Sequence, residues 1–374
     1  MRERLHTLFF ILMFLIHGSI AYFIERDQTT LYFISFYSLV LFWFLSWFDP
    51  KFFSGHYSGL RIVMIGLLMR AIYLIAIPAM SDDVFRYLWD GHLCLQGVSP
   101  FQFTPMDWMR AHPDFGASYL YPLLNSKPYY SVYPPVQQAI YCSVAFIGGH
   151  GLELQIIVFR CIAILAELGS MLLILKLLDH YRKPYQLLLL YALNPLIIIE
   201  FVGNLHGEVF MVFFMLLFLW WHLNGRVFPA AVAFAMAVLT KLLPLIFLPA
   251  IIWRSKPKKY VSYLVTLGVL VFVCAQPFIT PDSASNMFSS LQKYFINFEF
   301  NASIYYVIRE VGYWWKGWNI IAEAGKILPI IVFILIMAQS FWKRRSAQLA
   351  TVFMFCWMTY YLFSTTVHPW YIAV

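Results

Sequence analysis

The amino-acid sequence predicts an all-α fold, a polytopic bundle of about 10–11 transmembrane helices, some of them broken or re-entrant. Of its 374 residues, 61% are hydrophobic, 20% are aromatic and only 12% are charged, and the mean hydropathy is +0.71. Average soluble domains are roughly 45–50% apolar and about 25% charged. The composition therefore excludes a soluble globular protein, a disordered chain and a nucleic-acid-binding protein.

The apolar segments form one predicted membrane domain, residues 1–374, without a short internal repeat. The runs expected to form helices are 8–24, 31–48, 60–79, 136–149, 155–178, 186–202, 208–223, 227–253, 260–280, 320–342 and 347–366. The run 227–253 contains Pro229, Pro244 and Pro249. Prolines break the hydrogen-bond ladder of a helix, so this run is expected to form two short helices and not one crossing.

The N-terminal run and the cysteines bear on processing and redox state. The first run follows basic residues and could pass for a signal peptide, but the segment 18–21 is a poor cleavage site, so a retained first span is expected. The five cysteines are odd in number and widely spaced, which favours neither a disulfide framework nor a metal cluster.

Basic clusters predict which loops face the cytoplasm, because Lys and Arg accumulate there. The clusters are Arg2 with Arg4, Lys51 with Arg61, Lys176 with Arg182 and Lys183, the segment 254–259, and the segment 343–345. The long loop 80–135, the loops near 203–207 and 281–319, and the end around His368 then fall on the non-cytoplasmic side. Two full crossings between residues 136 and 178 would contradict the third cluster, so one of those helices is expected to be a half-helix or an interfacial helix.

The densest polar segment, SDDVFRYLWDG at residues 81–91, begins the loop 80–135. On a helix, one face of this segment would carry Asp83, Arg86, Tyr87 and Asp90. Residue types alone give equal weight to a functional site and to a solvated loop helix with a local Asp–Arg pair. The apolar residues Leu88 and Trp89 suggest that such a helix lies on the membrane surface.

A set of motifs in a fixed order gives this segment a more specific meaning. After SDDVFRYLWDG come QGVSPF at 96–101, YPP at 133–135, NPL at 194–196 leading to HGE at 206–208, KLLP at 241–244, and HPWY at 368–371. This set, spread over about residues 75–371, closely resembles the GT-C class of membrane glycosyltransferases. Within that class it is most similar to the bacterial mannosyltransferases that depend on polyprenol-phosphate-mannose.

Two departures from that family are visible. The family usually has His-Asn-Asp where this chain has His206-Gly207-Glu208, which keeps the acid one methylene longer and lacks the Asn. The family continues with further spans after its His-Pro-Trp-Tyr, whereas this chain stops at Val374, so truncation of the chain is expected.

The resemblance implies an enzyme that moves a hexose, expected to be mannose, from a polyprenyl-phosphate donor to a glycan or glycolipid acceptor. The site would face the outside of a bacterial plasma membrane. The sequence contains no Gly-rich phosphate loop and no dinucleotide fingerprint, which argues against a nucleotide-sugar donor.

Inverting transfer needs one carboxylate base, because attack and departure occur on opposite faces of the sugar. Asp83 aligns with the loop acid of the family and is the predicted base. Asp82 is the second candidate, and Asp90 is expected to position the acceptor or Arg86. A neighbouring carboxylate raises the pKa of one member of such a pair, which suits a base.

The residues expected to bind substrate and its phosphate are Arg86, Tyr87, Glu200, Asn204, His206, Glu208, Lys241 and His368. Arg forks two donors onto a phosphate, and a Lys within a membrane segment is a functional candidate by default. The alternatives are a Lys241–Glu200 pair or snorkelling, and capping or structural roles for His206 and His368. No metal ligand is predicted. A divalent cation remains possible if Asp82, Asp83, His206 and Glu208 meet, although no ligand spacing supports one.

Other charged and aromatic residues are predicted to be structural. Arg70, Arg160 and Glu167 lie within apolar runs. Arg160 and Glu167 are about 10 Å apart along a helix axis, too far for a direct pair, so each needs partners on other helices. The aromatic run Tyr313, Trp314 and Trp315, with Trp318, is typical of an interfacial aromatic belt, although it could also stack on sugar rings.

A transporter or flippase for a lipid-linked sugar is the alternative from another functional class, because it also needs broken helices and buried charges. The polar cluster in one outside loop and the absence of visible half-to-half symmetry disfavour it. The geometric test is convergence. In a transferase, Asp83, His206, Lys241 and His368 should meet at one cavity.

Overall fold

The computed structural model describes residues 2–47, 58–296 and 298–374, so Lys51, a predicted cytoplasmic residue, lies outside the described residues. Over these residues the all-α prediction is confirmed. No strand element is present in the described ranges, which contain one isolated bridge between Phe300 and Thr366.

The helices follow the predicted apolar runs. The first half of the chain contains α1 (Arg2–Tyr22), α2 (Thr29–Leu45), α3 (Ser58–Ala71), α4 (Asp83–Leu95), α5 (Pro105–Ala111), η1 (Ser118–Leu123), α6 (Pro135–Gly148), α7 (Leu152–His180), η2 (Tyr185–Leu188), α8 (Leu189–Ala192), α9 (Pro195–Ile197) and η3 (Ile198–Gly203). The second half contains α10 (Glu208–Leu223), α11 (Val227–Thr240), η4 (Leu243–Phe247), α12 (Leu248–Arg254), α13 (Pro257–Ala275), η5 (Gln276–Phe278), α14 (Ser283–Ile296), α15 (Ile304–Lys316), α16 (Ile321–Trp342), α17 (Leu349–Phe363) and α18 (Pro369–Ile372). The run 227–253 is broken at Lys241, as its prolines predict.

Three helices in the described part of the chain are long and apolar enough to cross a membrane: Leu152–His180, Pro257–Phe278 and Ile321–Trp342. The pair Tyr185–Ala192 and Pro195–Gly203, bent by 46°, is a fourth if it counts as one span. Shorter apolar helices of 10–17 residues make up the rest of the bundle. The predicted membrane character is therefore confirmed. Most of the apolar runs, however, form helices that are shorter than a full membrane crossing or are bent, so the structure does not contain ten or eleven full-length spans in the described residues.

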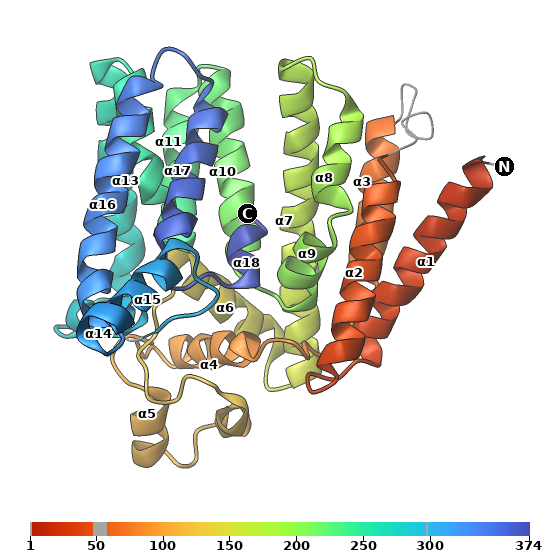
Figure 1. Cartoon of the computed structure of the whole chain (residues 1–374). Coiled ribbons are helices and arrows are strands. Elements are labelled where there is room, and N and C mark those ends of the chain that lie inside the picture. The colour runs from red at the N-terminus through yellow and green to blue at the C-terminus, as the bar shows by residue number, and fades with distance from the viewer. Residues whose placement is uncertain (1, 48–57, 297) are drawn as a thin grey trace.

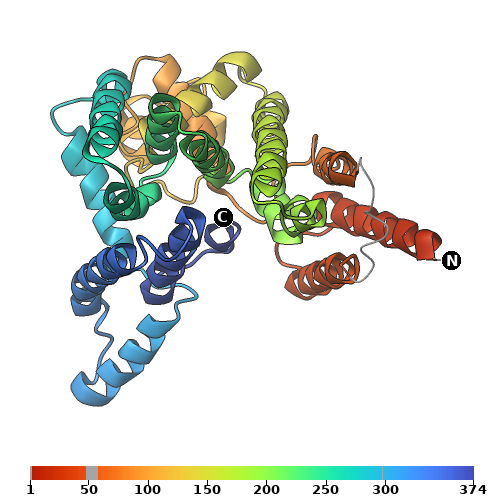
Figure 2. The same cartoon turned by 90° about the horizontal axis from the view of Figure 1, so that it is seen from above.

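The two predicted groups of loops lie at opposite ends of the bundle (Figure 1). The end of α7 and the connections from α12 to α13 and from α16 to α17, which carry basic clusters, lie at the upper end. The helices α4, α5, α14 and α15 lie at the lower end, where α4 runs across the long helices. Figure 2 shows the C-terminus between the α1–α3 side of the bundle and the helices of the second half. The site residues predicted to face one side therefore share one end of the molecule.

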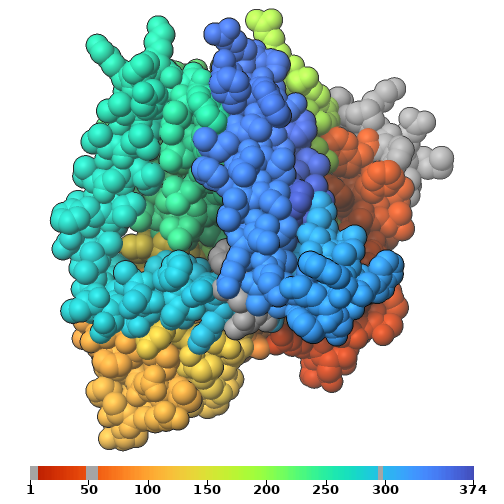
Figure 3. All heavy atoms as spheres, turned by 60° about the vertical axis from the view of Figure 1, so that its left-hand side comes forward, coloured from red at the N-terminus to blue at the C-terminus, as the bar shows by residue number. Residues whose placement is uncertain are grey.

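The lengths of α6 and α7 bear on the half-helix expected between residues 136 and 178. The helix α6 has 14 residues, whereas α7 has 29. A helix rises about 1.5 Å per residue, so α6 is too short to cross a bilayer of about 30 Å. The expected half-helix is α6, and the loop region between α4 and α6 projects beyond the bundle (Figure 3).

The helix α4 is part of the protein interior, which corrects two sequence interpretations. Leu88 and Trp89 are fully buried, so they do not form a membrane-facing surface. Arg86 and Asp90 are also buried, so α4 is not a solvated loop helix. Gly97, at φ +72°, ends the helix with a left-handed turn in which Val98 N–H donates to the Leu93 carbonyl. The amphipathic pattern was ambiguous because a hydrophobic stripe packs equally well against protein or lipid.

The contact between α4 and α6 depends on Gly91. A Cβ at this position would lie 2.3 Å from the backbone oxygen of Tyr141, which cannot move away as a side chain can. We therefore expect Gly91→Ala to lower the free energy of unfolding by about 1–3 kcal/mol through overpacking. The measurement is reversible unfolding in detergent micelles. Gly268→Ala in α13 is the control, because nothing lies within 4 Å of its added Cβ. Equal stabilities of the two variants would contradict the prediction.

The predicted structural roles of the membrane-embedded charges are confirmed for Arg70 and Glu167. Arg70 Nε donates to Glu167 Oε2 at 2.7 Å, and both side chains are fully buried. Tyr191 donates to the other carboxylate oxygen of Glu167. Arg70 Nη1 also donates to the carbonyls of Gly66 and Ala192. This network joins α3, α7 and α8.

The predicted aromatic belt lies on and just after α15. Trp314 and Trp315 are 87% and 78% exposed, and Trp318 is also exposed. Exposed indole rings at one end of a helical bundle fit a position among lipid headgroups. The belt stays a prediction.

Candidate active site

The predicted base, Asp83, is the first residue of α4 and keeps 24% of its side chain exposed. Asn125 donates to Asp83 Oδ1 at 3.0 Å, and Asp83 Oδ2 lies 3.8 Å from His206 Nε2. Ser81 accepts from the Asp83 backbone N–H and contacts His206 Nε2 at 3.1 Å. A carboxylate at a helix N-terminus is stabilised by the helix dipole. Asp83 is thus oriented by three polar groups and still reachable by a ligand.

His206 lies in a sharp turn between two helices. The π-helical segment η3 ends at Gly203, and the next turn places Leu205 at φ +63°, a conformation that is costly for a residue with a branched side chain. His206 is fully buried and its Nδ1 lies 3.0 Å from Glu200 Oε2. Asn204 donates to the same carboxylate oxygen at 3.1 Å. The strained turn therefore directs the imidazole toward two carboxylates.

Lys241 is brought to the same end by the break after α11. Its ammonium forms an ion pair with the buried Glu208 and lies 4.1 Å from the centre of the Tyr371 ring. The partner is thus Glu208, and the alternative pairing with Glu200 is wrong. The lysine side chain is 31% exposed, so the ammonium is partly available to an anion.

The C-terminal HPWY motif packs onto His206 through a stack of rings. Trp370 stacks on His206 with centroids 3.9 Å apart and on His368 with centroids 4.4 Å apart. His368 in turn stacks on Phe300 at 5.0 Å. Tyr371, which Lys241 contacts, lies 5.2 Å from His368 between ring centres. The four residues named in the convergence test, Asp83, His206, Lys241 and His368, therefore lie together through direct contacts or one intervening ring, and their convergence at one cavity stays a prediction.

The pKa values of the two histidines at this end shift in opposite directions. Burial by itself lowers the pKa of His206, but the hydrogen bond and charge of Glu200 outweigh it and hold this pKa above its ordinary value. The charges of Asp83 and Glu208 add to that increase. Burial lowers the pKa of His368, which the nearby His206 and Lys241 reinforce. His206 is therefore the histidine favoured as a cation.

The other predicted residues of α4 support the site from within the protein. Arg86 Nε donates to Asp90 at 2.8 Å, and its Nη1 donates to the carbonyls of Ser126 and Tyr129. Asp90 also accepts from Ser131 at 2.6 Å. These contacts fix the loop 126–131 on α4.

Tyr87 is buried, and its ring stacks on Tyr141 with centroids 4.6 Å apart. The structure thus places the Tyr87 ring in an aromatic contact between α4 and α6. Contact of Arg86, Tyr87 and Asp90 with substrate stays a prediction.

The second candidate base, Asp82, has a different partner from Asp83. Its carboxylate pairs with Arg26 at 2.6 Å, and both side chains are substantially exposed. Across residues 2–47, 58–296 and 298–374, no three His, Cys, Asp or Glu side chains are grouped so that they could hold a metal ion.

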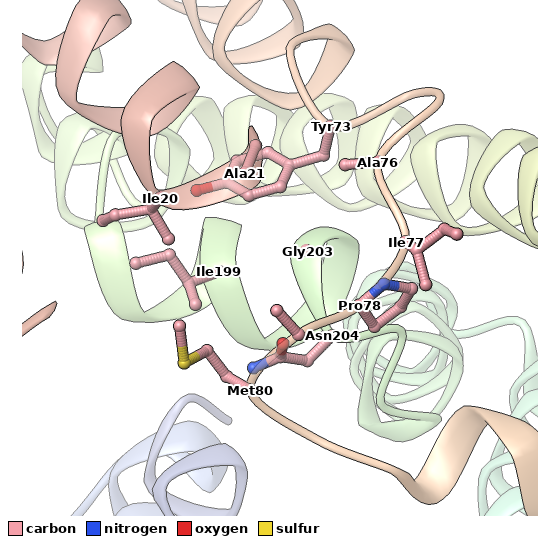
Figure 4. Close-up of a pocket in the computed structure, with 11 residues that line it drawn as sticks. Ile20, Ala21, Tyr73, Ala76, Ile77, Pro78, Met80, Ile199, Gly203 and Asn204 are labelled. Carbon is pink, nitrogen blue, oxygen red and sulfur yellow. The ribbon is translucent and has the colours of Figure 1, made fainter. Parts of the chain in front are cut away.

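A shallow pocket lies beside these residues (Figure 4). It is bordered by the end of α1, the segment 73–80 and the end of η3, and Asn204 contributes a polar side chain to its wall. The segment 73–80 leads directly to Ser81, and η3 leads to His206. The pocket therefore marks where the segment that leads to Asp83 and the segment that leads to His206, together called the two site loops, run side by side.

Sequence reasoning missed several contributors to the site. Ser81 and Asn125 contact the two main candidates, and Trp370 stacks on His206. Ser81 begins the acidic motif and Trp370 belongs to HPWY, so both carried a weak signal. Asn125 lies 42 residues from Asp83 in the same predicted loop, 80–135, but no motif or charge singled it out within that loop.

Comparison with known proteins gives the site a family context. The family model described as alpha-(1->6)-mannopyranosyltransferase, N-terminal domain, matches residues 19–256. The chain is also similar to alpha-(1->6)-mannopyranosyltransferase A of Corynebacterium glutamicum, with 24% identity over 196 residues. That match covers 50% of this chain and 39% of the relative, so the chain spans about two fifths of the length of the curated relative it matches. No solved structure matches the chain.

The family match covers the segments that hold most of the site. Asp83, His206 and Lys241 lie within the matched residues, and His368 lies beyond them. The mannosyltransferase resemblance carried by the ordered motifs is thereby confirmed at the level of the family. Because the match covers more than half of the chain, this protein belongs to the alpha-(1->6)-mannopyranosyltransferase family of membrane glycosyltransferases.

Proposed function

We propose that this protein transfers mannose from a polyprenyl-phosphate donor to an acceptor hydroxyl at the non-cytoplasmic membrane face. One observation carries the proposal. The partly exposed carboxylate of Asp83 lies 3.8 Å from His206, whose pKa is raised, at the end of the bundle that also holds Lys241. A base and two cationic groups in one place match the needs of sugar transfer from a phosphate.

In the proposed reaction, Asp83 accepts the proton of the acceptor hydroxyl as its oxygen attacks the anomeric carbon. The bond between that carbon and the phosphate oxygen breaks, and polyprenyl phosphate leaves with the electron pair. Attack opposite the leaving group inverts the anomeric centre, so one carboxylate suffices. The family and the curated relative are described as α-(1→6) enzymes, so we propose that the acceptor presents the 6-hydroxyl of a mannoside.

The phosphate has two proposed partners. Cationic His206 would donate a charge-assisted hydrogen bond, and Lys241 would supply a point charge. Both are held by carboxylates, Glu200 and Glu208, in the structure. An arriving phosphate would therefore have to compete with these carboxylates for the two cations.

The test uses the purified protein with polyprenyl-phosphate mannose and a synthetic mannoside acceptor. We expect a product one hexose heavier by mass spectrometry, with the anomeric configuration opposite to that of the donor by NMR. GDP-mannose and polyprenyl-phosphate glucose are the matched donor controls and should give no product. Transfer from GDP-mannose alone, or a retained configuration, would refute the proposed donor or mechanism.

The pH dependence of transfer should follow His206. Its raised pKa keeps the cation present below that pKa and loses it as the pH rises through it. Glu200→Gln removes the hydrogen bond and charge that raise this pKa, so the alkaline limb of kcat/KM should move to lower pH. Glu153→Gln is the control, since Glu153 is exposed at the start of α7. An unmoved alkaline limb in Glu200→Gln would rule out cationic His206 as a phosphate ligand.

A further inference from the structure

Arg160, in the first third of α7, is buried and bound to backbone carbonyls of two separate segments. Its Nε donates to the Val202 carbonyl at 2.9 Å, and its Nη2 donates to the Gly203 carbonyl at 3.1 Å. Its Nη1 donates to the carbonyls of Leu74 and Ala76 at 3.1 and 2.6 Å. One guanidinium therefore uses all three of its nitrogens on the two segments.

These carbonyls lie where helical structure ends. Leu74 and Ala76 lie in the turns that follow α3, and Val202 and Gly203 are the last residues of η3. The last carbonyls of a helix, here those of Val202 and Gly203, have no partner within it and carry partial negative charge, so a cation there is stabilising. Leu74 and Ala76 add two loop carbonyls beyond the end of α3 at Ala71. Among the described residues, Arg160 has no carboxylate within ion-pair distance, whereas Arg70 is paired with Glu167. Backbone carbonyl dipoles thus take the place of a carboxylate at Arg160.

Each segment leads directly into the active site. The first continues through residues 77–80 to Ser81 and Asp83, and the second continues through Asn204 to His206. Figure 4 shows the segments carrying Ala76 and Gly203 on the wall of the same pocket. Farther along, the two loops meet again through the contact between Ser81 and His206. Arg160 therefore fixes the point from which both loops depart.

We propose that Arg160 is a positioning residue that sets the distance between Asp83 and His206 by holding both site loops on α7. The expected effect of Arg160 on catalysis rests on the proposed function. Its bridging of the two segments rests on the structure alone. Only the planar fork of Arg presents donors to both segments at once, because a Lys ammonium is a single point. Arg160→Lys should therefore fail to replace it despite keeping the charge.

The first measurement needs no substrate. We expect Arg160→Gln and Arg160→Lys to increase hydrogen–deuterium exchange in both segments, 72–83 and 199–208, together. Glu153→Gln is the control, because Glu153 lies on the exposed first turn of the same helix. Its loss of an exposed charge should leave both segments at the wild-type exchange rate. Faster exchange in only one segment, or in neither, would overturn the proposal, as would equal changes in the control.

The second measurement is transfer by the same variants, after size-exclusion chromatography has shown that they are monodisperse. A displacement of about 1 Å costs roughly 10²-fold in rate, so kcat should fall by about that factor with KM within about threefold of wild type. The alkaline limb of kcat/KM should also move to lower pH. The charge of Asp83 helps to raise the pKa of His206, and this contribution weakens when the two residues move apart.

The two measurements separate this inference from the proposed function. If wild-type protein transfers no mannose, the proposed function fails, and the exchange data still decide whether Arg160 bridges the loops. Wild-type kcat in Arg160→Lys would overturn the positioning role.

Discussion

Asp83→Asn is expected to lower kcat for mannosyl transfer by about 10²–10⁴-fold, the usual contribution of a general base. The amide keeps the shape of the side chain and a bond to Asn125, but it cannot accept the proton of the acceptor hydroxyl. KM should change little, because Asp83 does not hold the donor phosphate in the proposed reaction. The measurement is steady-state transfer from polyprenyl-phosphate mannose.

Two further variants sharpen this test. Asp83→Ala leaves space at a partly exposed position, so added formate should restore part of the lost rate by acting as a diffusible base. Asp114→Asn is the control, since Asp114 is an exposed acid of the same loop and its variant should keep wild-type activity. If Asp82→Asn lost the activity and Asp83→Asn kept it, the base would be the neighbouring residue.

Glu167→Ala is expected to lower the free energy of unfolding by about 3–5 kcal/mol, because it leaves the Arg70 cation buried without its partner. The carboxylate accepts from Arg70 and from Tyr191, so its removal breaks the network that joins α3, α7 and α8. Reversible unfolding in detergent micelles measures the effect. At temperatures where the variant is folded, transfer activity should persist, because the network does not contact Asp83 or His206 in the structure.

The cost should come from the orphaned charge and not from lost volume. In the double variant Arg70→Met with Glu167→Leu, well-packed apolar side chains replace the pair, so most of the stability should return. Glu153→Ala on the exposed first turn of α7 should stay within about 0.5 kcal/mol of wild type. If Glu167→Ala were no more costly than Glu153→Ala, the buried pair would contribute nothing measurable.

The sequence was most informative at the charged and polar residues, because they are rare in this chain. In a chain with only 12% charged residues, the acidic run at 82–90, His206 and Lys241 stand out from their apolar surroundings. The broken helix around Lys241 followed from its prolines, because a missing N–H and a ring clash act locally. Such features depend on residue type and near neighbours, so they can be predicted before any fold is known.

Partners distant in sequence could not be predicted in the same way. Lys241 pairs with Glu208 and not with Glu200, and Asp83 contacts Asn125, a residue of the loop 80–135 that no motif singles out. An ion pair or hydrogen bond of this kind is selected by a few ångströms of helix packing, which residue types do not encode. The burial of Trp89 against protein instead of lipid is another such case, since both environments are apolar.

By itself the sequence determined that this protein is a helical membrane protein whose ordered motifs resemble a mannosyltransferase family, and it predicted that the polar residues gather at one end. These conclusions rest on composition, periodicity and ordered motifs, which are local properties of the chain. Only the tertiary structure decided that Asp83 and His206 lie 3.8 Å apart and that Arg160 joins the loops that carry them. The reason is physical: backbone carbonyls are present at every residue, and only folding selects the four that surround one buried guanidinium.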